Sequence, residues 1–221
     1  MSSAKYQSTY GQQAVEVKET ALSYRGFFTV HQAKLKHKLF RGGWSDWISR
    51  EVVDRGHAVV VLPYDPVRDS IVMLEQFRVG AVDALGAAKR HPSQPEASPW
   101  LLELVAGMVD GDESGEEVAA REMQEEAGLT AERLEFALSY MSSPGGLTER
   151  ITIYVAQVDA TSASAYGGLA SEHEDIRVFE IQRTQALELL DKGYLDNAAT
   201  VIALQWLALH REQLLQKWNQ E

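Results

Sequence analysis

The sequence predicts an α/β protein in which helices pack on a mixed β-sheet, with a small antiparallel β-domain at the N-terminus. Strand-like and helix-like segments follow one another in the order strands, helix, strands, helix, which favours a sheet covered by helices. The first 53 residues contain only strand-like segments, and so small a unit buries too little apolar surface to stand alone. We therefore divide the chain into an N-terminal β-domain, 1–53, and a main domain, 54–221.

The composition is that of a globular protein without disulfides. Of the 221 residues, 45% are hydrophobic, 24% are charged and none is cysteine, so disulfide and thiolate chemistry are excluded. There is no signal-peptide pattern and no run of about 18 apolar residues, so we expect a cytoplasmic protein without a membrane partner. The net charge of −11 argues against a nucleic-acid partner, because such binding depends on cationic contacts with phosphates.

Three strands are predicted in the N-terminal domain. Residues 15–23 and 26–40 are enriched in aromatic and β-branched residues with short runs of alternation, and 48–53 reads as a further strand. Arg41 to Gly43 is a turn signal between them. We expect this small sheet to pack on the main domain or on a second subunit.

The main domain begins with a predicted central strand. The run HAVVVLP at 57–63 is almost entirely apolar, as expected of a strand buried on both faces. A turn at 65–69 leads to its hairpin partner, 70–77. Residues 86–99 are rich in alanine, proline and serine and are predicted to form an exposed loop, followed by a short strand at 100–105.

The second half of the main domain is predicted to contain three more strands. Two of them, 134–142 and 150–158, are joined by a turn at 143–146, and the third is 176–180. A loop of small residues at 160–170 separates the second strand from the third.

Two helices are predicted near the C-terminus. The first, 184–191, would be capped by Thr184 and end before Gly193. The second, 196–218, is apolar on most sides through Leu209 and is therefore expected to be largely buried.

An acidic helix is predicted in the middle of the chain. Ser114 or Asp112 could cap it, and Gly128 should end it. Glu122 and Glu126 lie about 40° apart on one face, and two like charges at this spacing cost a helix roughly 0.2–0.5 kcal/mol. Mg²⁺ or Mn²⁺ would turn this repulsion into binding, although a solvated acidic face is the alternative.

The stretch from Gly107 to Leu129 resembles the Nudix box. The box positions, all matched at the family's spacing, are Gly107, Glu113, Arg121, Glu122, Met123, Glu125, Glu126, Gly128 and Leu129. Members of the Nudix family share an α/β/α sandwich with a mixed sheet, and they cleave a nucleoside diphosphate linked to another group. The resemblance therefore implies this fold and this reaction.

Beyond the box, the sequence resembles the ADP-ribose pyrophosphatases of bacteria, a branch of the family. Pro144 follows Leu129 at the branch's distance, the stretch 171–177 resembles its catalytic loop, and Asp196 to Ala199 resembles its C-terminal segment. The resemblance implies hydrolysis of ADP-ribose to AMP and ribose 5-phosphate with two or three Mg²⁺ ions per site, for which Mn²⁺ may substitute. The 86–99 loop, longer than usual, is the main departure.

The resemblance also implies which residues bind metal and transfer protons. The implied metal ligands are the Ala106 carbonyl and the carboxylates of Glu122, Glu126 and Glu174. Glu172 matches the general base, with Glu125 as the alternative. Arg121 would orient the box glutamates, and neither it nor Glu113 is expected to touch substrate. The alternatives are a solvated acidic loop for Glu172 and Glu174 and a surface ion pair for Arg121.

Substrate contacts are expected from both ends of the fold. Arg78 suits bidentate contact with phosphate. Arg50 and Glu51 resemble a pair that reaches the nucleotide of the neighbouring subunit, and Phe28 or Phe27 could stack on adenine, with core packing as the alternative. Pro144 and Gly145 complete the expected substrate-binding residues. We therefore expect a homodimer.

Two other functions are compatible with the box. One is a pyrophosphatase for a different nucleoside diphosphate derivative, an ADP-sugar or a GDP-sugar. The other is a non-catalytic Nudix-fold nucleotide sensor, against which the complete set of box glutamates argues. Residues 1–53 could also bind another protein, but dimerisation would let Arg50 and Glu51 complete the site.

Overall fold

The computed structural model describes residues 8–86, 91, 94–96 and 98–220, so part of the 86–99 loop lies outside the described residues. The chain divides into two compact units, each described here by itself. The first comprises Met1–Gly56 and Met141–Glu149, and the second comprises His57–Tyr140 and Arg150–Glu221. The role of 1–53 as a dimerisation domain stays a prediction.

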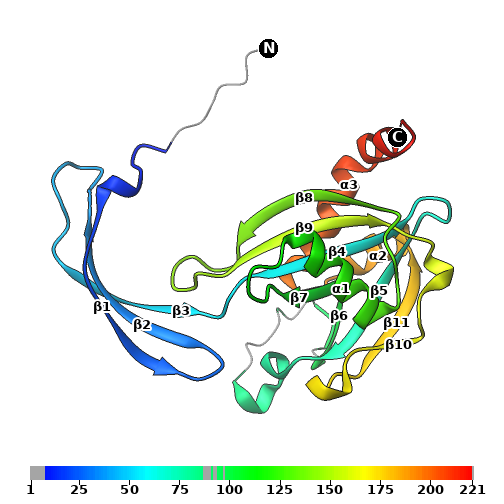
Figure 1. Cartoon of the computed structure of the whole chain (residues 1–221), viewed down its shortest axis with the longest axis horizontal. Helices are drawn as coiled ribbons and strands as arrows, with labels where there is room; N and C mark the ends of the chain where they lie inside the picture. Colours follow the sequence, from blue (N-terminus) through cyan, green and yellow to red (C-terminus); the bar gives the residue numbers. More distant parts are fainter. Residues whose placement is uncertain (1–7, 87–90, 92–93, 97, 221) are drawn as a thin grey trace. The chain divides into compact units, whose positions relative to one another are not determined.

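The first unit is a three-stranded antiparallel sheet in the order β1-β2-β3 (Figure 1). Its elements are η1 (Gln12–Ala14), β1 (Val15–Arg25), β2 (Thr29–His37) and β3 (Ile48–Asp54). The predicted strand 26–40 is shortened because Gly26 begins the turn, where its N–H donates to the Phe28 carbonyl at 3.0 Å. Val53 joins the 141–149 segment to β3, since its N–H donates to the Gly146 carbonyl at 2.8 Å.

The second unit contains the predicted mixed sheet. In the described part of the chain its strands run in the order β10-β11-β5-β4-β9-β8, with β6 paired to β5 and β7 to β4. Strand β4 is parallel to β9 and antiparallel to β5 and β7. The strands are β4 (Ala58–Asp65), β5 (Ser70–Phe77), β6 (Trp100–Glu103), β7 (Val105–Met108), β8 (Arg133–Met141), β9 (Arg150–Gln157), β10 (Tyr166–Gly167) and β11 (Ile176–Gln182).

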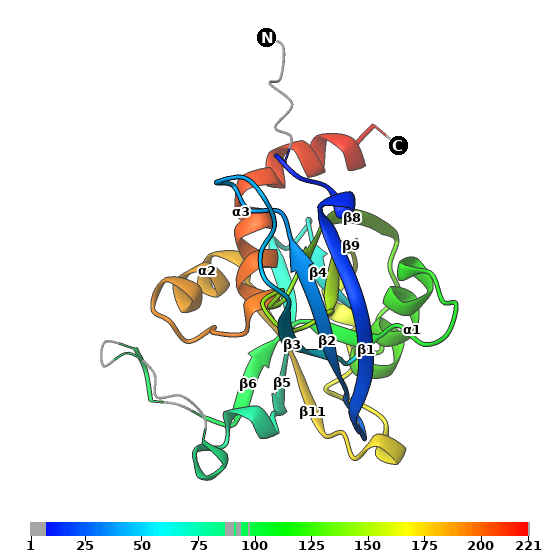
Figure 2. The same cartoon turned by 90° about the vertical axis from the view of Figure 1, so that its left-hand side faces the viewer.

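Helices cover both faces of this sheet, and β4 explains why. Side chains of a strand alternate between faces, so Val59 and Val61 pack in the core formed with α1 (Gly115–Ala127), whereas Val60 and Leu62 pack in the core formed with α2 (Arg183–Asp191) and α3 (Ala198–Trp218). Figure 2 shows α1 on one side of the sheet and α2 and α3 on the other. The predicted α/β/α architecture is confirmed.

Two predictions about the C-terminal helices were wrong. Helix α2 begins one residue earlier than predicted, with Gln182 at its N-cap and no side-chain cap bond, so Thr184 lies in the first turn and caps nothing. Helix α3 is buried on one face only. Its buried residues recur at spacings of three and four, and Leu209, two positions beyond buried Leu207, turns about 200° away and is 78% exposed.

A predicted strand and a predicted loop also differ from the structure. The segment 100–105 does not form one strand, because Leu104 separates β6, which pairs with β5, from β7, which pairs with β4. The predicted loop 160–170 contains the two-residue strand β10, which pairs with β11. Among the described residues, no helix is long and apolar enough to cross a bilayer.

A charged network fixes the two C-terminal helices to the hairpin between β4 and β5. Asp69 accepts hydrogen bonds from Tyr64 Oη at 2.7 Å, Arg183 Nε at 2.8 Å and Arg211 Nε at 3.1 Å. Chiefly because of the Arg183 bond, and despite burial, the pKa of Asp69 falls from 3.8 to about 2. The carboxylate is therefore favoured in the folded state.

Replacing Asp69 with asparagine removes the charge that pairs with Arg183 and should lower the melting temperature at pH 7 by roughly 2–4 °C, about 1 kcal/mol. The expected loss is small because the carboxyl is about one-third exposed and water screens it. A carboxyl whose pKa is lower in the folded state stabilises the fold at pH values above its ordinary pKa of 3.8, and this stabilisation is lost as the pH falls toward 2. The difference from wild type should therefore shrink between pH 4 and pH 2.

Thermal unfolding followed by circular dichroism at pH 7 and pH 2.5 measures this difference. Glu188→Gln is the control, since its pair with Lys192 at 3.5 Å is exposed and should change the melting temperature by less than about 1 °C. An Asp69→Asn difference as large at pH 2.5 as at pH 7 would contradict the electrostatic explanation.

Candidate functional site

Helix α1 is held at both ends by its own sequence. Ser114, one of the two predicted caps, accepts a hydrogen bond from the Glu117 N–H, and the Glu117 carboxylate accepts from the Ser114 N–H at 2.8 Å, which completes a capping box. At the other end Gly128 adopts the left-handed conformation, φ 65°, which glycine takes without steric cost. The helix is thus fixed in length on the face of the sheet next to β7.

The two predicted metal-binding carboxylates of this helix face inward. Glu122 is 9% exposed and Glu126 only 2%. The Ala106 N–H, on β7, donates to Glu126 Oε2 at 2.8 Å. Burial, reinforced by the charges of Glu122 and Glu174, raises the pKa of Glu126 to about 8, and burial also raises the pKa of Glu122. Their buried environment disfavours the ionised form of both side chains unless a cation compensates the negative charge.

Gly107 leaves the space that the Glu122 side chain occupies. A Cβ added at residue 107 would overlap the Oε1, Cδ and Cγ atoms of Glu122. Only glycine lets the β7 backbone approach α1 so closely without displacing this carboxylate.

Arg121 connects the box residues to one another. Its guanidinium donates to Glu113 Oε1 at 3.1 Å, to Glu122 Oε1 at 2.6 Å and to Glu125 Oε2 at 3.2 Å, and also to the Met108 carbonyl. These bonds, first of all those with Glu113, raise the pKa of Arg121. The arginine therefore holds two carboxylates of its own helix, those of Glu122 and Glu125.

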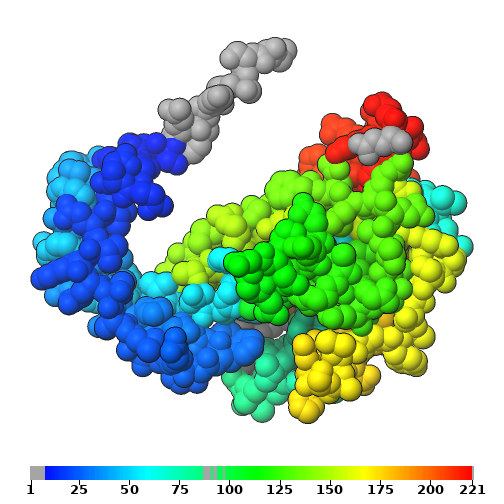
Figure 3. All heavy atoms as spheres, viewed as in Figure 1, coloured from blue at the N-terminus to red at the C-terminus, as the bar shows by residue number. Residues whose placement is uncertain are grey.

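The loop carrying Glu172 and Glu174 is attached to the C-terminal end of α1. The Ser164 N–H donates to the Ala127 carbonyl and the Gly168 N–H to the Glu125 carbonyl, each at 2.9 Å. These bonds satisfy carbonyls that a helix end leaves without partners. In Figure 3 the yellow surface of this loop adjoins the green surface of α1.

Beyond this attachment, the loop turns sharply between its two glutamates. His173 has φ 58°, an uncommon conformation for a residue other than glycine. Glu174 Oε2 accepts from the Leu169 N–H at 3.2 Å. The negative charge of Glu174 contributes to the raised pKa of both Glu122 and Glu126. The structure therefore brings Glu174 near the helix carboxylates, while Glu172 lies at the end of the short turn η5 (Ala170–Glu172).

Arg78, directly after β5, is bound to a glutamate that the sequence analysis did not identify. Glu103 Oε2 accepts a hydrogen bond from Arg78 Nε at 2.9 Å and forms an ion pair with Nη2 at 2.7 Å, and Glu103 Oε1 accepts from Asn197 Nδ2 at 2.9 Å. Burial disfavours the guanidinium charge, but the bonds and charge of Glu103 outweigh it and raise the pKa of Arg78. The available signal was a single glutamate inside the apolar run WLLELV, since a buried charge requires a partner.

The remaining predicted substrate-binding residues belong to the first unit. Arg50 and Glu51 lie on β3, opposite Ala33 and Gln32 of β2. Phe28 precedes β2. Its ring centre lies 5.2 Å from that of Phe27, in an edge-to-face arrangement, and 5.9 Å from the Arg55 guanidinium. Pro144 and Gly145 lie in the turn between β8 and β9.

Comparison with known proteins identifies the family. The NUDIX domain matches residues 55–210, most of the chain. This chain belongs to the NUDIX family. It is 48% identical over 210 residues to the ADP-ribose pyrophosphatase of Escherichia coli K12, with 95% of each chain covered. It is 44% identical to that of Haemophilus influenzae, covering 95% of this chain and 93% of the relative.

A solved structure supports the fold. The crystal structure of an ADP compounds hydrolase matches with a TM-score of 0.66 at 22% identity, covering 95% of this chain and 98% of that one. At this identity the likeness concerns the NUDIX fold alone. It agrees with the predicted fold class.

The donor atoms of the NUDIX box fit a hard divalent cation. Among the described residues no three acidic or histidine side chains form a ready-made metal site. Glu122 is bound to Arg121, Glu126 to Ala106 and Glu174 to Leu169. All three are nevertheless oxygen donors, and their charges act on one another. Oxygen ligands of this kind suit Mg²⁺ or Mn²⁺, which would require Glu122 to exchange an arginine N–H for the cation.

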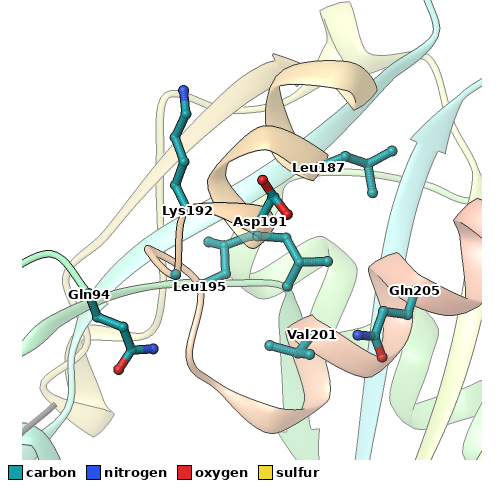
Figure 4. Close-up of a pocket in the computed structure, with 9 residues that line it drawn as sticks. Gln94, Leu187, Asp191, Lys192, Leu195, Val201 and Gln205 are labelled. Atoms are coloured by element: carbon teal, nitrogen blue, oxygen red, sulfur yellow. The ribbon is translucent and has the colours of Figure 1, made fainter. Parts of the chain in front are cut away.

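A separate hollow of about 630 Å³ lies between the end of α2 and the start of α3 (Figure 4). Its labelled lining residues are Gln94, Leu187, Asp191, Lys192, Leu195, Val201 and Gln205. None of the predicted site residues lines it. The hollow is therefore separate from the residues of the NUDIX box.

Proposed function

We propose that this protein hydrolyses the diphosphate of ADP-ribose to AMP and ribose 5-phosphate, with Mg²⁺ bound by the NUDIX box. The observation that carries the proposal is the 44–48% identity, over 95% of the chain, to curated relatives named ADP-ribose pyrophosphatase. The buried carboxylates of α1 support it from the structure, because they provide oxygen ligands that a cation would stabilise.

The metal-binding residues would be Glu122, Glu126, Glu174 and the carbonyl of Ala106. Two or three Mg²⁺ ions, or Mn²⁺ in their place, would offset the negative charge of the diphosphate. The helix keeps Glu122 and Glu126 rigid, whereas Glu174 lies on a loop and can adjust.

Proton transfer falls to a carboxylate near these ligands. In the proposed step a water oxygen forms a bond to one phosphorus, the bridging oxygen leaves with the other phosphate, and Glu172 accepts the water proton. Glu125 is the alternative base, but its bond to Arg121 at 3.2 Å favours a supporting role. Arg78 would bind the phosphate oxygens.

We propose further that the protein is a homodimer in which Phe28, Arg50 and Glu51 of one copy contact the nucleotide bound by the other. Strand β1 supports this proposal. It is an edge strand whose residues are all exposed, including Val17, Leu22 and Tyr24. An exposed edge with large apolar side chains favours a covering partner. Pro144 and Gly145 would lie in the same substrate region.

A substrate panel tests the reaction. ADP-ribose, ADP-glucose, NADH, GDP-mannose and a dinucleoside polyphosphate are offered separately with Mg²⁺, and products are separated by ion-exchange chromatography. We expect ADP-ribose to have the highest kcat/KM and to yield AMP with ribose 5-phosphate. A higher kcat/KM for GDP-mannose would instead favour a GDP-sugar pyrophosphatase, and binding without turnover of any compound would favour a nucleotide sensor.

Variants of the box locate this activity. Glu122→Gln keeps the side-chain shape but removes a charged ligand, so we expect a folded protein that loses on the order of 100-fold in kcat. Glu116→Gln, on the same helix but exposed, is the control and should stay within about twofold of wild type. Near-normal turnover of Glu122→Gln at saturating Mg²⁺ would remove the metal assignment.

Light scattering coupled to size exclusion tests the dimer. We expect about twice the 24.6 kDa mass of one chain, and a Leu22→Asp, Tyr24→Asp double variant should shift the protein toward the monomer with a higher KM for ADP-ribose. A fully active wild-type monomer would exclude a site shared between copies.

A further inference from the structure

We propose that Glu103 is a positioning residue for the reaction: it holds the Arg78 guanidinium so that the opposite edge of this group faces the substrate diphosphate. The inference rests on the proposed function and adds a residue that neither the box nor the sequence analysis includes. Glu103 does not itself touch substrate in this arrangement.

The contact between the two side chains has a defined direction. In the described part of the chain, the side-chain contacts of Arg78 use Nε and Nη2, both directed to Glu103 Oε2. The guanidinium is planar, so fixing this edge also fixes the Nη1 edge. Glu103 is 3% exposed whereas the Arg78 side chain is 42% exposed, so the arginine extends from a buried carboxylate toward solvent, where an anion can reach it.

The Glu103 carboxylate is itself fixed by three elements. Asn197 Nδ2 donates to Oε1 at 2.9 Å, and Gln76 Nε2 donates to Oε2 at 3.3 Å. Asn197 is the N-cap of α3, since its Oδ1 accepts from the Thr200 N–H at 3.1 Å. Strands β5 and β6 and the start of α3 therefore meet at one carboxylate, which leaves Arg78 little freedom to rotate.

Without this partner, other anions would attract the guanidinium. The charges of Glu126 and Glu174 act on Arg78, and both carboxylates belong to the proposed metal-binding set. An arginine released from Glu103 would turn toward them and compete with the cation for their oxygens. Glu103 thus keeps the Arg78 guanidinium apart from the carboxylates of Glu126 and Glu174.

A purely structural ion pair is the competing explanation, since many buried pairs only offset their own desolvation. It predicts a loss of stability and no change in ligand affinity per folded molecule. Nucleotide affinity separates the two explanations, and ADP in buffer with EDTA measures the contribution of Arg78 without the metal.

The test variant is Glu103→Gln, which keeps the side-chain volume and removes the charge. We expect isothermal titration calorimetry to give about 10-fold weaker ADP binding in EDTA, and the KM for ADP-ribose with Mg²⁺ to rise more than kcat falls. Glu180→Gln is the matched control, because its bidentate pair with Arg68 at 2.7 and 3.0 Å lies apart from the box. It should leave ADP affinity and KM within about twofold of wild type.

A double-mutant cycle tests whether Glu103 acts through Arg78. In an Arg78→Ala background, Glu103→Gln should change ADP affinity by less than about twofold, because the group it positions is absent. If Glu103→Gln folds poorly, Asn197→Ser serves in its place. Serine can still cap α3, but it loses the bond to Glu103, and a smaller loss of ADP affinity is expected.

The outcomes separate this proposal from the proposed function. A lower melting temperature with unchanged ADP affinity and KM in Glu103→Gln overturns the positioning role, as do fully additive effects of the two substitutions. A wild-type protein that binds ADP but does not hydrolyse ADP-ribose overturns the proposed function, while the ADP measurements still decide the role of Glu103.

Discussion

Burial of two acidic side chains, Glu122 and Glu126, is the constraint on which the second unit depends. Folding places both on the inner face of α1, where burial raises their pKa values. The protein compensates them only in part, through Arg121 and the Ala106 N–H. The two raised pKa values therefore occur side by side on one helix, and such clustering of perturbed pKa values is typical of functional sites. In this account a divalent cation removes the remaining electrostatic cost of their burial.

Helix caps, close packing and backbone hydrogen bonds hold the elements around these carboxylates in place. The capping box and Gly128 fix α1, and Gly107 allows β7 to pass directly behind Glu122. The loop with Glu172 and Glu174 is tied to the helix end through backbone bonds at Ser164 and Gly168. The loop that carries Glu172 and Glu174 is therefore attached directly to the helix that carries the box carboxylates.

Much of this could be predicted from the sequence because the signals are local. The apolar run at 57–63 predicts a strand buried on both faces, and the glycines and charges of 107–129 predict the capped helix with its carboxylates. The pattern failed where tertiary packing decides. Leu209 continues an apolar sequence but faces away from the sheet, and Thr184 has the chemistry of a cap but lies two residues after the actual N-cap, Gln182.

The partners of Glu103 could not be predicted from local sequence patterns. Its partners Arg78 and Asn197 are 25 and 94 positions away in the sequence, so only the fold brings them together. The sequence could indicate that a charge in WLLELV requires a partner, but it could not name one. Positioning residues of this kind depend on long-range contacts, and a motif confined to 23 residues of chain does not contain them.

The most direct test of the central claim is to locate the metal. Crystals grown with Mn²⁺ and a non-hydrolysable ADP-ribose analogue would be measured at the manganese absorption edge, where anomalous scattering identifies the ion. The account predicts anomalous peaks in contact with Glu122, Glu126 and the Ala106 carbonyl, with the Arg121–Glu122 bond of 2.6 Å broken or lengthened. Bound analogue with no peak beside these carboxylates, and Arg121 still on Glu122, would contradict it.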